Sequence, residues 1–131
     1  MILKLLKLLY LKNRLKKGGI DKKKIGNIGE DFASTFLELK GYRILKRNVF
    51  VKGGEVDILA KKGRNLYLFE VKYRRGDKFG DAFDSIDKRK REKLYNISNL
   101  FDTHLYENIE IKLFYINIDE KGKLTYGIID I

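Results

Sequence analysis

Three carboxylates and a lysine could together perform metal-assisted chemistry on a phosphate. Glu55 and Asp57 lie in one short segment, and Glu70 and Lys72 lie in the next. In both segments polar and apolar residues alternate, which is typical of β-strands and places the polar side chains on one face. We therefore expect two neighbouring strands whose charged side chains gather on a shared surface.

A two-residue turn at Gly63-Arg64 would join these strands, because glycine accepts a positive φ. That turn sets a pairing in which Asp57 faces Glu70 and Glu55 faces Lys72. Directly opposed residues have Cβ atoms about 5 Å apart, and like charges there are destabilising. The pairing predicts a cation between Asp57 and Glu70, and a divalent metal ion is the natural candidate.

Mg²⁺ or Mn²⁺ fits this pattern, since both prefer oxygen ligands and bind one or two carboxylates together with a substrate phosphate. Asp57 and Glu70 would supply the carboxylates, and the backbone carbonyl of Val71 a further ligand. Lys72 would orient or help to deprotonate the attacking water and stabilise charge on the phosphate. The alternative is a solvated hairpin face with a Glu55–Lys72 ion pair, because 36% of the residues are charged.

The motif formed by Asp57, a spacer and Glu70-Val71-Lys72 resembles that of the PD-(D/E)XK nuclease superfamily, which has the restriction-endonuclease-like fold. More narrowly, the chain resembles the YraN-like family of uncharacterised predicted endonucleases. Val56 stands where the superfamily name has proline, and residues 1–24 have no counterpart. The matching positions are Gly26, Gly29-Glu30, Ala33, Gly41 to Leu45, Asn48, 54–60, Phe69 to Lys72, Arg74, Phe79-Gly80 and Lys90.

The resemblance implies a role for each matched residue. Asp57 and Glu70 would be metal ligands, Lys72 the catalytic lysine, and Glu30 an accessory acid from the first helix. Archaeal Holliday-junction resolvases share this layout and act as dimers, so a homodimer is a further expectation.

The composition limits the classes of enzyme that the chain can be. At 131 residues one domain is expected. Without cysteine there is no disulfide, thiolate zinc site or thiol nucleophile. His104 is the single histidine, which excludes nucleases built on paired histidines. With no export signal or spanning segment recognised, a cytoplasmic location is expected.

The net charge of +11 favours a polyanionic partner such as DNA. The charge is uneven, because residues 1–24 carry nine basic side chains and one acidic one. Residues 1–24 therefore form a basic extension to a domain at 25–131.

The extension is expected to be an amphipathic helix followed by a flexible basic linker that includes Lys16 to Gly19 and Lys22 to Lys24. Its apolar run is too short to span a bilayer, which takes about 20 residues. The helix would dock on its own domain or on a second copy; peripheral membrane contact by residues 1–17 and phosphate contact are the alternatives. Its apolar face comprises Ile2, Leu3, Leu5, Leu6, Leu9 and Tyr10, with Lys4, Lys7 and Arg14 opposite.

The remaining segments predict an α/β fold with the order αβββαββ and a central mixed sheet flanked by helices. A helix from Ile25 would stop at Gly41, and a second, capped by Asp81, would run from about Ala82 to His104. Its inward stripe is Phe83, Ile86, Leu94, Ile97 and Phe101. The strands would be 42–51, 54–60, 67–74, 108–118 and 123–131.

Lys90 interrupts the inward stripe of the second helix. A lysine at such a position must extend to solvent or meet an anion. The anion would be a phosphate or a site carboxylate, and the alternative is an ion pair on the helix surface. With Arg89 and Arg74, Lys90 is predicted to bind nucleic acid.

Three hypotheses follow. The first is a Mg²⁺-dependent endonuclease that hydrolyses phosphodiester bonds in DNA, with a Holliday-junction resolvase as its nearest variant. The second is a nucleic-acid-binding module that has the fold without turnover. The third is an interaction protein that its first helix recruits to a membrane or a partner.

Overall fold

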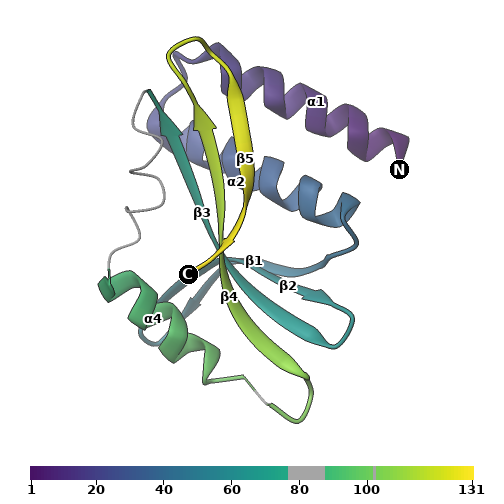
Figure 1. The fold of residues 1–131 in the computed structure, drawn as a ribbon, viewed down its shortest axis with the longest axis vertical. Helices are drawn as coiled ribbons and strands as arrows, with labels where there is room; N and C mark the ends of the chain where they lie inside the picture. Colours follow the sequence, from purple (N-terminus) through teal and green to yellow (C-terminus); the bar gives the residue numbers. More distant parts are fainter. Residues whose placement is uncertain (77–87, 102) are drawn as a thin grey trace.

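The computed structural model describes residues 1–76, 88–101 and 103–131 (Figure 1). Its five-stranded sheet has the order β1-β2-β3-β4-β5; β3 and β4 are parallel and the other neighbours antiparallel. This confirms the predicted fold class, an α/β mixed sheet of order αβββαββ flanked by helices, with a helical extension. The elements are α1 (Ile2–Lys17), α2 (Lys22–Leu39), β1 (Arg43–Val51), β2 (Gly54–Lys62), β3 (Asn65–Arg75), α4 (Lys88–Ser98), β4 (Asn108–Ile118) and β5 (Leu124–Asp130).

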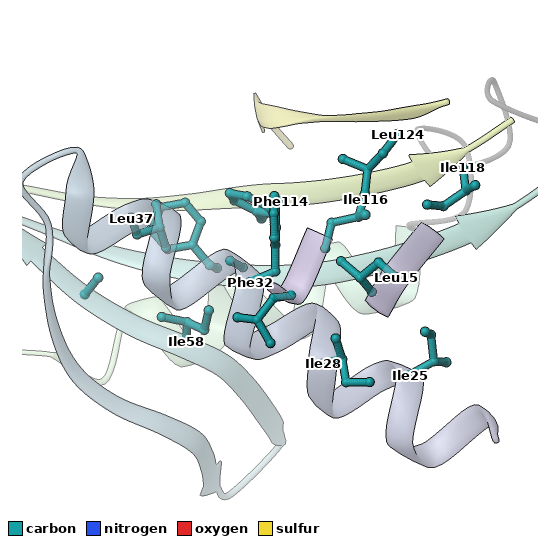
Figure 2. Close-up of a cluster of buried hydrophobic side chains, with 14 of the residues drawn as sticks. Leu15, Ile25, Ile28, Phe32, Leu37, Ile58, Phe114, Ile116, Ile118 and Leu124 are labelled. Carbon is teal, nitrogen blue, oxygen red and sulfur yellow. The ribbon is translucent and has the colours of Figure 1, made fainter. Parts of the chain in front are cut away.

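The larger hydrophobic core lies between α2 and one face of the sheet (Figure 2). Apolar residues of α2 recur at three- and four-residue spacing, so they share the side of the helix that meets the strands. Phe32 is fully buried, and its ring contacts Phe114 and Tyr126 edge-to-face. This packing fixes α2, and therefore Glu30, relative to the sheet.

A smaller core on the other face of the sheet fixes α4. Leu94 and Ile97 of α4 pack against residues of β2 and β3 and are 1% exposed. The strand residues are Val56, Leu59, Leu66 and Leu68. Because α1 and α2 pack on one face and α4 on the other, the sheet separates the two helical layers.

Helix α2 begins at Lys22, three residues before the predicted start at Ile25. The side chain of Asp21 accepts a hydrogen bond from the backbone N–H of Lys23 at 2.9 Å and caps the helix. Lys22 to Lys24 are thus helical, and the prediction that they form a flexible linker was wrong. The predicted stop is confirmed, since α2 ends at Leu39 and Gly41 has a φ of 91°.

Helix α4 ends at Ser98, not at the predicted His104. After Ser98 the chain makes tight turns, in which Leu100 N–H donates to the carbonyl of Ile97. Leu100 and Leu105 are exposed, whereas Phe101 still packs beside the smaller core. The predicted start at Ala82, the Asp81 cap and the inward positions Phe83 and Ile86 lie outside the described residues.

Helix α1 packs on α2, as one of the predicted alternatives proposed. Leu11 and Leu15 are buried against the larger core, and Leu8 packs beside them. The Arg75 guanidinium of β3 donates to the Leu15 and Lys16 carbonyls at 3.1 and 3.0 Å, which satisfies the end of the helix. The broad apolar face predicted for α1 is therefore not the face that docks.

None of the helices in the described residues combines the length and apolar character needed to cross a membrane.

Candidate functional site

The β2–β3 hairpin has the predicted register over its outer part. Lys62 pairs with Asn65, and the ladder continues to Ile58 and Phe69. It ends there, so the predicted direct pairs Asp57–Glu70 and Glu55–Lys72 do not form part of it. Instead, the Asp57 carboxylate accepts the backbone N–H of Val71 at 2.8 Å.

Asn48 of β1 has an unusual backbone conformation near this point. In the β1–β2 register it lies between the pairs Arg47–Ile58 and Val49–Val56, and its φ of 52° places it in the left-handed region that asparagine tolerates. The alternation of faces breaks here, since Val56 packs with α4 whereas Ile58 packs with α2. The regular alternation predicted for this segment is therefore wrong at Asp57, whose carboxylate meets the backbone of β3.

Glu70 is the most buried charged residue of the site, at 2% exposed. Its Oε1 lies 2.5 Å from Lys90 Nζ and 3.6 Å from Lys72 Nζ. Its Oε2 is buried and accepts no hydrogen bond from the described residues. Burial first, and then the charge of Asp57, raise the pKa of Glu70 to about 7 despite the two lysines.

Glu30 of α2 faces the same group of acids. Burial and the charge of Asp57 raise the pKa of Glu30 to about 7, and Arg47 opposes them. The Asn48 amide, oriented so that its NH₂ meets the acidic side chains, donates to Glu30 Oε1 at 2.9 Å and to Glu55 Oε1 at 3.2 Å. The structure thus places Glu30 of α2 near the acids of the strands, and its role as an accessory acid stays a prediction.

The predicted metal ligands form a pair of carboxylates in this structure. Among the described residues, no group of three histidine, aspartate or glutamate side chains is arranged to hold a metal ion. Asp57 and Glu70 nevertheless fit a hard divalent cation, because both offer carboxylate oxygens and Glu70 Oε2 is buried without a hydrogen-bond donor from the described part of the chain. Val71 meets Asp57 through its N–H, and metal binding by its carbonyl oxygen stays a prediction.

A pocket of about 380 Å³ opens between α4 and the start of β2, where Gly54 and Glu55 line it. Arg89 and Lys90 line it, at the positions predicted to bind nucleic acid. Burial alone would lower the pKa of Lys90, but the hydrogen bond with Glu70 and its charge outweigh burial and raise it. Arg74 instead donates to the carbonyl of Tyr73 and is not among the pocket residues.

Two residues near the site were given no chemical role from the sequence. Asn48 was recognised from the sequence only as a position that matches the family, and its backbone conformation and its two acceptors show what it contacts. Lys93 lines the pocket four residues after Arg89. The four-residue spacing on a helix puts both on one face, and this was the signal that could have found Lys93.

The metal-free protein is expected to be less stable at pH 8 than at pH 5. The pKa values of Glu30 and Glu70 are raised from 4.5 to about 7, so the folded state holds more protons than the unfolded state between these values. Stability therefore falls as the pH rises from about 4.5 to 7 and then levels off. Urea unfolding at pH 5 and pH 8 in EDTA measures this, and a rise toward pH 8 would contradict it.

Asp57→Ala is expected to lower the free energy of unfolding by about 1–3 kcal/mol, because the half-buried Val71 N–H loses its acceptor. Asp57→Asn keeps an oxygen at that position and should change stability by less than about 1 kcal/mol. Urea unfolding of both variants checks this. Equal losses in the two variants would show that the hydrogen bond contributes nothing.

Comparison with known proteins identifies relatives over most of the chain. Residues 29–118 match the uncharacterised protein family UPF0102. A UPF0102 protein of Dictyoglomus thermophilum is 36% identical over 108 residues, which cover 80% of this chain and 92% of the relative. One of Caldicellulosiruptor saccharolyticus is 43% identical over 82 residues, which cover 63% of this chain and 70% of that relative.

Among solved structures, SfsA of Pyrococcus furiosus in complex with Ca²⁺ is similar with a TM-score of 0.38 and 16% identity. The match covers 85% of this chain and 65% of SfsA.

Proposed function

The chain belongs to the uncharacterised protein family UPF0102, the predicted YraN-like family, and we propose that it is a metal-dependent nuclease acting on DNA. One observation carries the proposal: Glu70 is buried near the charge of Asp57, and its Oε2 accepts no hydrogen bond from the residues that the structure describes. The pocket beside it is lined by Arg89, Lys90 and Lys93 together with Glu55. Two carboxylates that repel each other inside a protein are stabilised by a bound cation. A basic pocket beside them attracts a phosphate.

Asp57 and Glu70 would hold Mg²⁺ or Mn²⁺. When bound, the cation supplies positive charge that neutralises both carboxylates and the phosphate oxygens. Lys72, at 3.6 Å from Glu70, orients the attacking water, helps to remove its proton and stabilises the charge developing on the phosphate. Water then adds across one P–O bond and leaves a phosphomonoester end and a hydroxyl end.

In this proposal the contacts of Lys90 differ between the metal-free and the metal-bound protein. In the metal-free protein it neutralises Glu70 at 2.5 Å. With a cation bound, Glu70 would attract Lys90 less strongly, and Lys90, whose side chain is 41% exposed and lines the pocket, would also contact a phosphate. Arg89 and Lys93 extend the same pocket, so the DNA backbone would lie along α4.

Cleavage of labelled single-stranded, duplex, flap and four-way-junction DNA with Mg²⁺ or Mn²⁺ tests the proposal. Asp57→Asn should remove metal-dependent cutting, and Lys72→Ala should slow it by on the order of 100-fold. Lys121→Ala is the control, because Lys121 is an exposed lysine in the β4–β5 turn. Cutting that survives Asp57→Asn would contradict the assigned site.

The ion pairs of Glu70 also support a second candidate, a DNA-binding module without turnover. Lys90 and Lys72 already balance the charge of Glu70 without a metal. Binding of the same DNAs with no cutting under either metal would favour this module. Two symmetric nicks restricted to the four-way junction would instead identify a Holliday-junction resolvase.

A further inference from the structure

The outward face of α1 is apolar and uncovered among the described residues. Ile2, Leu6, Leu9 and Tyr10 are 67%, 56%, 51% and 60% exposed. They recur at three- and four-residue spacing, so they form one stripe along the helix. The stripe is turned away from Leu8, Leu11 and Leu15, which pack on the domain. Helix α1 therefore has two apolar faces, of which the fold uses one.

Basic side chains border this stripe on both sides. At 100° per residue, Lys7 and Arg14 lie along one border and Lys12 and Lys16 along the other. Residues 1–20 contain no acidic side chain. An exposed apolar stripe between two basic borders matches a flat partner that is apolar within and anionic at its surface.

The position of α1 in the fold leaves this stripe accessible. Figure 1 shows α1 beside α2 at an outer edge of the molecule. The basic pocket on α4 lies on the opposite face of the sheet. A partner bound to the outer face of α1 would therefore leave that pocket open.

We propose that the outer face of α1 binds the surface of a bilayer that contains anionic lipids. Ile2, Leu6, Leu9 and Tyr10 enter the boundary between headgroups and acyl chains, and the bordering lysines and arginine contact lipid phosphates. The helix lies in the plane of the surface and does not cross it, in keeping with its length of 16 residues.

A lipid surface explains the stripe better than two other partners do. DNA would attract the basic borders but would leave the leucines exposed, because a phosphate backbone offers them no apolar contact. A second copy would bring together two segments that each carry nine basic side chains and one acidic one. Like charges at that density oppose association.

Co-sedimentation of the full-length protein with vesicles tests the proposal independently of any nuclease activity. The vesicles are phosphatidylcholine alone or with about one third phosphatidylglycerol. Wild type should bind the anionic vesicles and lose binding in about 0.5 M NaCl, which screens the basic borders. Leu6→Asp/Leu9→Asp should lower the partition coefficient at least about tenfold.

The matched control is Leu100→Asp/Leu105→Asp. It makes the same change of charge at two apolar residues that are 66% and 67% exposed outside α1. This variant should bind as wild type does, and equal thermal midpoints would show that both variants fold. Binding that Leu6→Asp/Leu9→Asp does not weaken, or no binding to anionic vesicles, would overturn the proposal.

Two further measurements would show whether a second copy of the chain or DNA binds the outer face of α1 in place of a lipid surface. Light scattering after gel filtration would overturn the proposal if wild type dimerises and Leu6→Asp/Leu9→Asp does not. Duplex DNA binding that this variant loses, while vesicle binding is absent, would assign the face to nucleic acid.

Discussion

Glu70→Gln is expected to remove metal-dependent cleavage and also to make the metal-free protein more stable at pH 8. The carboxylate is buried, and burial together with Asp57 raises the pKa of Glu70 to about 7. At pH 8 the folded protein therefore holds an unfavourable charge, which costs on the order of 3 kcal/mol. A neutral amide of nearly the same shape avoids this cost.

The same substitution should lower the cleavage rate by on the order of 1,000-fold, because an amide is a much poorer ligand for Mg²⁺ or Mn²⁺ than a carboxylate. Lys90 and Lys72 are not left buried without a counter-charge, since their side chains are 41% and 22% exposed and can be hydrated. A substitution that raises the stability of the metal-free protein and lowers the cleavage rate is expected where a buried carboxylate binds a cation.

Urea unfolding at pH 5 and pH 8 in EDTA, beside cleavage in Mg²⁺, measures both effects. Glu70→Gln should also reduce the loss of stability between pH 5 and pH 8. Glu107→Gln is the control, because Glu107 is exposed and the substitution should change neither quantity. A Glu70→Gln variant that is less stable than wild type at pH 8 would show that the Glu70–Lys90 pair is a structural ion pair.

Phe32→Ala is expected to lower the free energy of unfolding by about 3–5 kcal/mol. Phe32 is fully buried, and its ring lies 6.3 Å from the ring of Phe114 and 5.0 Å from that of Tyr126. Truncation would leave a cavity between α2 and the sheet. Because Glu30 lies two residues before Phe32 on α2, the loss of packing should also loosen the acids of the site.

Urea unfolding at pH 5 measures this effect where Glu30 and Glu70 are largely protonated. Phe50→Ala removes the same ring from a residue that is 77% exposed, and should cost less than about 1 kcal/mol. A loss below about 1 kcal/mol for Phe32→Ala would show that the contact of α2 with the sheet contributes little to stability.

Local patterns in the sequence were enough for the strands and the hairpin. Alternation of apolar and polar residues predicted β4 at the bounds observed and the other strands to within a few residues. The turn at Gly63-Arg64 predicted the outer register of the hairpin, because a two-residue turn leaves one pairing. The resemblance predicted the family and the fold class.

The sequence by itself determined the fold class and the family, because alternation, turn chemistry and motif spacing are local. Only the tertiary structure decided how the acidic and basic residues of the site meet. The break at Asn48, the hydrogen bond from Val71 to Asp57 and the contact of Lys90 with Glu70 each join segments far apart in the chain. The same holds for α1. This helix has two apolar faces, and its contact with α2 decides which of them is buried.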